Sequence, residues 1–276
     1  MAHNGVPAAI RRIARNFSGT LGLAARDLKS GEEVFFNADL IFPTASMIKI
    51  AILLELFRQR EAGRLELDEM LTVRRPQKTA GSGLVENMGD RVTLGLHDLA
   101  VLMNAISDNT ATNVLIDRLG IAKINRAIRD AGMAQTRLYR KITFDQQRRL
   151  KYPSFATGTP RDFMTLMTNL YEGGLLNEKN TQEMLAIMRV QKYMGNLTRY
   201  LRFNPYARHS PDWVASKTGS IPGVRNETGI IHTRRGAHVI SVMTKGCKDK
   251  KWTPDNEGTR TVAKVSRAIN RYFHGW

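Results

Sequence analysis

The chain has 276 residues, of which 42% are apolar, and its formal net charge is +17. This length and apolar content suffice for one large domain or two lobes, and they exclude a disordered or collagen-like chain. No apolar run reaches the roughly 18–20 residues that span a bilayer, so no transmembrane segment is expected.

The excess of basic residues favours anionic surroundings such as nucleic acid, anionic lipid or a cell wall. The Lys and Arg residues are dispersed, and no zinc-finger, RNA-recognition or basic-zipper pattern accompanies them. We therefore expect no nucleic-acid partner, whereas an anionic cell-wall surface remains a candidate. Cys247 is the single cysteine, which excludes an intrachain disulfide.

The first predicted element is a short amphipathic helix within MAHNGVPAAIRRIARNF. This segment lacks the separate apolar stretch and cleavage site of a signal peptide. We expect an exported protein whose signal peptide is absent from this sequence, with a cytoplasmic protein as the alternative. Residues 21–28 and 32–37 then predict a β-hairpin across Lys29-Ser30-Gly31.

Helical periodicity follows, and strands return near the end of the chain. Helices are predicted over residues 51–62, 96–106, 110–119, 122–130, 160–171, 178–190 and 259–273, and strands over 212–219, 225–233 and 237–244. This order predicts an α/β (α+β) fold with an antiparallel sheet of about five strands, built from residues 1–43 and 206–276 and flanked by terminal helices. An all-helical lobe over residues 44–205, including a loop over 138–160, is inserted. The active site is expected at the interface of the two lobes.

The segment PTASMIKIAILLEL places Ser46 and Lys49 on one side of a helix, about 5–6 Å apart at Cβ. The pair is either an N-cap serine with a solvated lysine or a nucleophile with its base. Two later motifs, Ser107-Asp108-Asn109 between two helices and Lys217-Thr218-Gly219 on a strand, favour the second interpretation. S-x-x-K, S-D-N and K-T-G together are the signature of class A β-lactamases and penicillin-binding proteins.

The sequence resembles the class A β-lactamase family from about Leu21 to Cys247. FPTASMIKI is similar to the family's nucleophile helix and SDNTATNVLIDRLG to its second motif helix. TGTPRDFMTLMTNL resembles the segment that leaves the omega loop, and SKTGSIPGVRNETGII the strand pair that flanks the substrate. The resemblance implies a β-lactam substrate, or a related acyl-peptide, that acylates Ser46 after a neutral Lys49 has removed the hydroxyl proton.

The resemblance also assigns the substrate contacts. Ser107 passes a proton towards the leaving nitrogen, and Asn109 holds the substrate amide. Lys217 and Thr218 attract the substrate carboxylate, while the backbone N–H groups of Ser46 and Ser220, which follows Gly219, form the oxyanion hole. Arg225 either reaches the same carboxylate or is an exposed strand residue.

No cofactor or metal is expected. His232 and His238 are predicted to face each other across a hairpin, but a pair without a third ligand is more often structural than zinc-binding.

The resemblance fails in the omega loop, where the family carries a glutamate and an asparagine that activate the deacylating water. Residues 138–160 contain no glutamate. Aligning Arg140 with the family's loop arginine places Ile142 at the glutamate, Gln146 near the asparagine and Ala156 at the aspartate that pairs with the arginine.

Asp145 is the only carboxylate in this loop, and it is either a substitute base or a solvated residue. The sequence therefore predicts a serine hydrolase that cleaves β-lactams with slow deacylation. One alternative is a D-Ala-D-Ala-type peptidase or esterase, and the other is a penicillin-binding sensor module that does not turn over.

Overall fold

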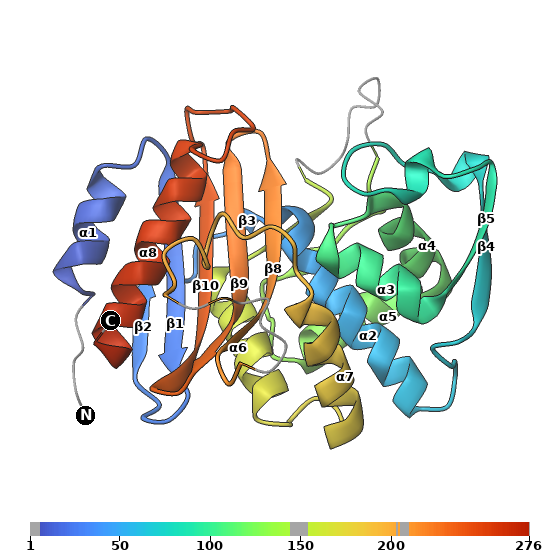
Figure 1. The fold of residues 1–276 in the computed structure, drawn as a ribbon, viewed down its shortest axis with the longest axis horizontal. Helices are drawn as coiled ribbons and strands as arrows, with labels where there is room; N and C mark the ends of the chain where they lie inside the picture. The colour runs from blue at the N-terminus through green and yellow to red at the C-terminus, as the bar shows by residue number, and fades with distance from the viewer. Residues whose placement is uncertain (1–5, 144–153, 203, 205–209, 276) are drawn as a thin grey trace.

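The structure is a computed structural model that describes residues 6–143, 154–202, 204 and 210–275. Its main sheet is antiparallel and has the strand order β2-β1-β10-β9-β8. The strands are β1 (Thr20–Asp27), β2 (Glu33–Phe36), β8 (Trp213–Ile221), β9 (Val224–Thr233) and β10 (Gly236–Lys245) (Figure 1). The predicted five-stranded sheet from both chain ends is confirmed.

Helices cover both faces of this sheet. On one face lie α1 (Ala8–Arg15) and α8 (Glu257–His274), and on the other α6 (Pro160–Tyr171) (Figure 1). Alternation along β1 sends Leu21 and Leu23 into a core with Val262 and Val265 of α8. Ala24 joins the core of the opposite face. Because β1 is buried on both faces, its sequence is a nearly continuous apolar run.

The helical part is built around α2 (Lys49–Glu61), which contacts α3 (Leu96–Ala105), α4 (Asn109–Leu119), α5 (Ile121–Asp130) and α7 (Glu178–Arg189). Residues 50–57 of α2 are all buried. A helix that is apolar all round must lie inside the protein, which explains the central position of α2. The predicted helices are confirmed to within a few residues at their ends.

The expectation of an all-helical segment over residues 44–205 is wrong. The segment also contains a hairpin of β4 (Met70–Arg74) and β5 (Arg91–Gly95). Its strands β6 (Arg137–Leu138) and β7 (Ala156–Gly158) form a small sheet with β3 (Phe42–Pro43), which lies just before the segment. The described residues also form the 3₁₀ turns η1 (Ala45–Ile48), η2 (Arg75–Gln77) and η3 (Val85–Asn87). A long connection separates β4 from β5, so no short turn motif marks the hairpin in the sequence.

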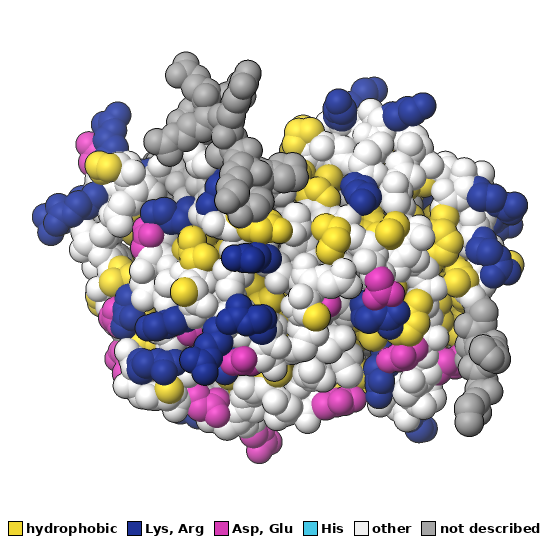
Figure 2. Space-filling view, turned by 180° about the vertical axis from the view of Figure 1, so that it is seen from behind, with side chains coloured by type: hydrophobic (Ala, Val, Ile, Leu, Met, Phe, Trp, Pro, Cys, Tyr) yellow, Lys and Arg dark blue, Asp and Glu magenta, His cyan; other side chains and the backbone are white. Residues whose placement is uncertain are grey.

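In the part of the chain that the structure describes, no helix has both the length and the apolarity to cross a membrane. Figure 2 shows one face of the molecule, with Lys and Arg side chains spread over both halves of it.

Candidate active site

Ser46 lies in the η1 turn that leads directly into α2. The preceding residue, Ala45, has a φ of +46°, a strained value for a residue with a side chain. Asn226 of β9 fixes this turn, because its Nδ2 donates to the carbonyl oxygens of Pro43 (2.9 Å) and Thr44 (3.3 Å). The nucleophile candidate is therefore held by a strand from the other end of the chain.

The K-T-G strand packs closely against the same turn. A Cβ on Gly219 would lie 2.5 Å from the carbonyl oxygen of Thr44 and 3.1 Å from the backbone nitrogen of Ser46. No side chain fits at these distances, so the glycine permits the approach of β8 to the nucleophile turn. The structure thus brings the first and third motifs together.

Lys49 joins the first motif to the second. It is 1% exposed, and its Nζ donates to the carbonyl oxygen of Ser107 (2.7 Å), to Ser107 Oγ (3.1 Å) and to Asn109 Oδ1 (3.0 Å). Ser107 has a φ of +58°, and both its hydroxyl and its carbonyl contact the one lysine. These contacts hold Lys49 inside the protein, so it is not the solvated lysine of the first interpretation.

Two buried lysines set the electrostatics of the site. Burial, followed by the nearby Lys217 cation, holds the pKa of Lys49 well below its usual value, although Asp108 opposes this shift. Burial lowers the pKa of Lys217 to about 7, and the Glu227 carboxylate opposes that shift. Lys217 Nζ donates to the carbonyl oxygen of Thr218 at 3.0 Å. Burial and the Lys217 cation both favour the neutral amine of Lys49 over its ammonium form.

Asp108 has a structural task within the second motif. It caps α4 by accepting from the backbone nitrogen of Ala111 (2.8 Å), an interaction that typically contributes about 1 kcal/mol. Its other oxygen accepts from the backbone nitrogens of Leu84 (2.7 Å) and Val85 (2.9 Å). The same carboxylate therefore caps α4 and attaches the loop before β5 to the site.

Arg225 is 4% exposed, so the alternative of an exposed strand arginine is wrong. Its guanidinium donates to the carbonyl oxygens of Ile221, Val224 and Lys251, and it lies 4.5 Å from the ring centroid of Trp252. A contact with a substrate carboxylate stays a prediction.

Ile142, at the position expected for the glutamate, is buried and bound to α4. Its backbone nitrogen donates to Asn113 Oδ1 (2.9 Å), and Asn113 Nδ2 donates to its carbonyl oxygen (2.8 Å). Asn113 lies one helical turn after Asn109, so Ile142 is held by the helix that carries the second motif. Sequence reasoning missed Asn113, although the N-x-x-x-N spacing places both amides on one face of α4.

The rest of this loop differs from the family pattern. Arg140 Nη1 donates to the carbonyl oxygen of Lys141 (3.1 Å), and its buried Nε has no hydrogen-bond partner among the residues that the structure describes. Ala156, at the position expected for an aspartate, is fully buried in β7. Asp145 and Gln146 lie outside the described residues.

The two strand histidines do not face each other, which corrects the sequence prediction. His232 is opposite Ala237 in register and stacks on Trp213 with ring centroids 4.9 Å apart. His238 is opposite Ile231, and its Nδ1 lies 3.1 Å from His274 Nε2. Among the described residues, no group of three or more His, Cys, Asp or Glu side chains could hold a metal ion.

A serine at the entrance of a buried helix, a buried lysine with a depressed pKa, and a K-T-G strand packed against them are the features of a serine β-lactamase-like hydrolase. The chain belongs to the β-lactamase enzyme family, whose model matches residues 6–273.

Three relatives illustrate the family. A β-lactamase structure from Sphaerobacter thermophilus is 30% identical, with a TM-score of 0.88 and coverage of 99% of this chain and 98% of that one. A variant of PBP-A, solved as an acyl-enzyme complex with penicillin G, is 28% identical, with a TM-score of 0.82 and coverage of 97% and 95%. A β-lactamase from Rhodobacter capsulatus is 25% identical over 95% of this chain and 87% of its own length.

Proposed function

We propose that β-lactams acylate this protein at Ser46 and that it hydrolyses them through the resulting acyl-enzyme. The observation that carries the proposal is the contact of buried Lys49 with both Ser107 and Asn109, next to the turn that holds Ser46. A depressed lysine pKa supplies the base that a serine hydroxyl needs at neutral pH.

In the proposed acylation step, a proton is relayed from Ser46 through Lys49 and Ser107 to the leaving nitrogen. Lys49 takes the proton of Ser46, whose Oγ forms a bond to the β-lactam carbonyl carbon. When the ring C–N bond breaks, the Ser107 hydroxyl gives its proton to the leaving nitrogen and takes one from Lys49. The 3.1 Å contact between Lys49 Nζ and Ser107 Oγ is short enough for this return.

The remaining site residues stabilise charge in this scheme. Backbone N–H groups of Ser46 and Ser220 bind the developing oxyanion, with typically about 3–4 kcal/mol per donor. Asn109 holds the substrate amide. Lys217 and Thr218, with Arg225, receive the substrate carboxylate, because a charged hydrogen bond to an anion is stronger than a neutral one.

Deacylation is slow in this proposal, because the buried side chain of Ile142 cannot activate water. Asn113 binds both backbone polar groups of Ile142, so the apolar side chain is held beside α4. A mutant of the relative PBP-A was solved as an acyl-enzyme complex with penicillin G, which supports formation of such an adduct on this fold. Asp145 is the candidate substitute base, and Asp145→Asn would then prolong the adduct.

Intact-mass analysis after penicillin G exposure tests the proposal. We expect one adduct in the parent, still present minutes after mixing, and none in Ser46→Ala. An adduct on Ser46→Ala would overturn the assignment of the nucleophile.

A chromogenic cephalosporin separates the alternatives. Sustained colour indicates a β-lactamase, and a single stoichiometric burst indicates a penicillin-binding sensor. An adduct-free protein that still cleaves D-Ala-D-Ala peptides or esters would be a peptidase or esterase.

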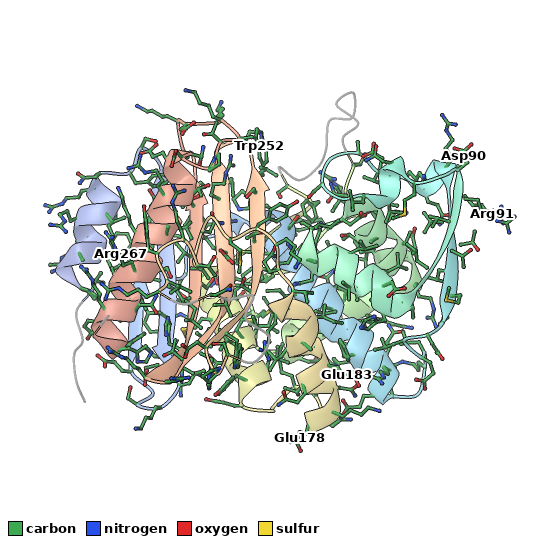
Figure 3. All side chains as sticks on the ribbon, viewed as in Figure 1. Asp90, Arg91, Glu178, Glu183, Trp252 and Arg267 are labelled. Carbon is green, nitrogen blue, oxygen red and sulfur yellow. The ribbon has the colours of Figure 1, made fainter. Side chains whose placement is uncertain are left out.

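We further propose an exported protein whose basic surface faces an anionic cell wall. Four exposed cations, Arg260, Lys264, Arg267 and Arg271, repeat every three or four residues along α8, where Figure 3 labels Arg267. These four side chains and Arg12 of α1 line one groove. Arg267→Glu with Lys264→Glu should weaken co-sedimentation with purified wall polymer without changing acylation.

A further inference from the structure

A buried carboxylate lies directly behind the K-T-G strand. Glu227 of β9 is 0% exposed, and its two oxygens accept from Ser216 Oγ (2.6 Å) and from the backbone nitrogen of Leu197 (2.9 Å). In register it is opposite Thr218, and its neighbour Thr228 is opposite Lys217. A buried carboxylate destabilises the fold unless hydrogen bonds and a cation compensate its charge.

Glu227 and the Lys217 side chain lie on opposite faces of the sheet. Residues alternate along β8, so Lys217 and Gly219 face the nucleophile turn, while Ser216 and Thr218 share the α8 side with Glu227. Glu227 therefore acts on Lys217 through the strand, without touching a substrate.

The other elements packed on Glu227 are uncharged where they meet it. Val242 is opposite on β10, and Leu197 is tied to α8 by a bond from Ser266 Oγ to its carbonyl oxygen (2.7 Å). Arg225 shares this face, but its guanidinium donates to three backbone carbonyls. Within the described residues, Lys217 is the charged group that acts on Glu227.

We propose that Glu227 is a positioning residue for acylation: it fixes the Ser216–Gly219 strand from behind, and its negative charge maintains the positive charge of Lys217. The inference rests on the proposed acylation at Ser46. It gives a role to a buried acid that the three catalytic motifs do not include.

The two charges sustain each other. Burial raises the pKa of Glu227 to about 7, whereas its hydrogen bonds and Lys217 lower it. Glu227 in turn opposes the fall in the pKa of Lys217. Without this carboxylate, the pKa of Lys217 falls further, and the site loses its cation at neutral pH. Lys49 then also loses the neighbouring charge that favours its neutral form.

The test is the pH profile of the acylation rate in Glu227→Gln, measured with penicillin G by intact-mass quench. The glutamine retains an acceptor for Leu197 and a polar group for Ser216 but has no charge. We expect the alkaline limb of the profile to move to lower pH by about one unit or more, as is typical on losing a neighbouring charge. Acylation by p-nitrophenyl acetate, which has no carboxylate, should lose less.

Two further variants separate charge from structure. Asp255→Asn removes an exposed carboxylate that pairs with Arg199, so its limb should stay in place. Ser216→Ala removes one donor to Glu227, favours the neutral acid, and should move the limb in the same direction by less. This second variant also keeps the test valid if Glu227→Gln does not fold.

An unmoved limb in both Glu227→Gln and Ser216→Ala, or an equal loss at every pH, would overturn the inference and leave Glu227 a structural residue. If the proposed function itself is wrong, the parent protein forms no penicillin adduct, and this result is distinct from an unmoved limb.

Discussion

Gly219→Ala tests whether the nucleophile turn and the K-T-G strand must touch. The added Cβ would lie 2.5 Å from the Thr44 carbonyl oxygen and 2.9 Å from the Met47 nitrogen, whereas ordinary contacts begin at 3.4 Å. Both neighbours are backbone atoms, so β8 or the turn must shift by about 1 Å. A misplacement of this size in a catalytic site can reduce the rate about 10²-fold. We therefore expect acylation by penicillin G to slow about 10²-fold in a folded protein.

The assay is the rate of adduct formation by quenched intact-mass measurement, with circular dichroism as the check on folding. Gly89→Ala is the matched control, because a Cβ there meets no atom within 4 Å. It should acylate at the parent rate. If Gly219→Ala also acylated at the parent rate, the strand would not limit the position of Ser46, and the geometric argument would be wrong.

Lys49→Ala should slow acylation by about 10²–10⁴-fold, the usual contribution of a general base, and a parent-like rate would exclude Lys49 as the base. Lys217→Ala should impair reaction with penicillin G more than with p-nitrophenyl acetate; equal losses would mean that Lys217 does not bind the carboxylate. Ile142→Glu should shorten the life of the penicillin adduct, and an unchanged life would place the deacylating water elsewhere. Because the folded pKa of Glu227, about 7, is above its ordinary 4.5, its stabilising contribution is present below pH 4.5 and lost as the pH rises through 7. We therefore expect the free energy of unfolding of Glu227→Gln, measured in urea relative to that of the parent, to rise by up to about 3 kcal/mol between pH 4.5 and 7. A difference that does not change with pH would contradict the raised pKa of the buried Glu227.

The catalytic motifs could be identified from the sequence because each motif consists of neighbouring residues. Ser46 and Lys49 are separated by less than one helical turn, and the apolar run after Ile50 predicts a buried helix without any tertiary information. The strands of the main sheet were equally visible, since short strand-like runs bounded by turn residues are properties of neighbouring residues.

Contacts between distant segments could not be derived in this way. In the sequence, Gly219 is an ordinary strand glycine. Its importance is visible only in the fold, which places Thr44 beside it. The sequence left Arg225 either at the substrate carboxylate or exposed on its strand, and it gave no sign that Glu227 is buried, because charged side chains are rarely buried without partners. Their partners are the carbonyl oxygen of Lys251 and the backbone nitrogen of Leu197, whose positions depend on the complete fold.

The pairing of β1 with β10 has a consequence for when the protein can act. The turn of Ser46 depends on Gly219 and Asn226, and β9, which carries Asn226, pairs with β10, the neighbour of the first strand. A growing chain carries its nucleophile early but has no working site until its last strand is in place, because contacts of such long range form late in folding. Removal of β10 alone would therefore abolish activity, although all three catalytic motifs would remain in the chain.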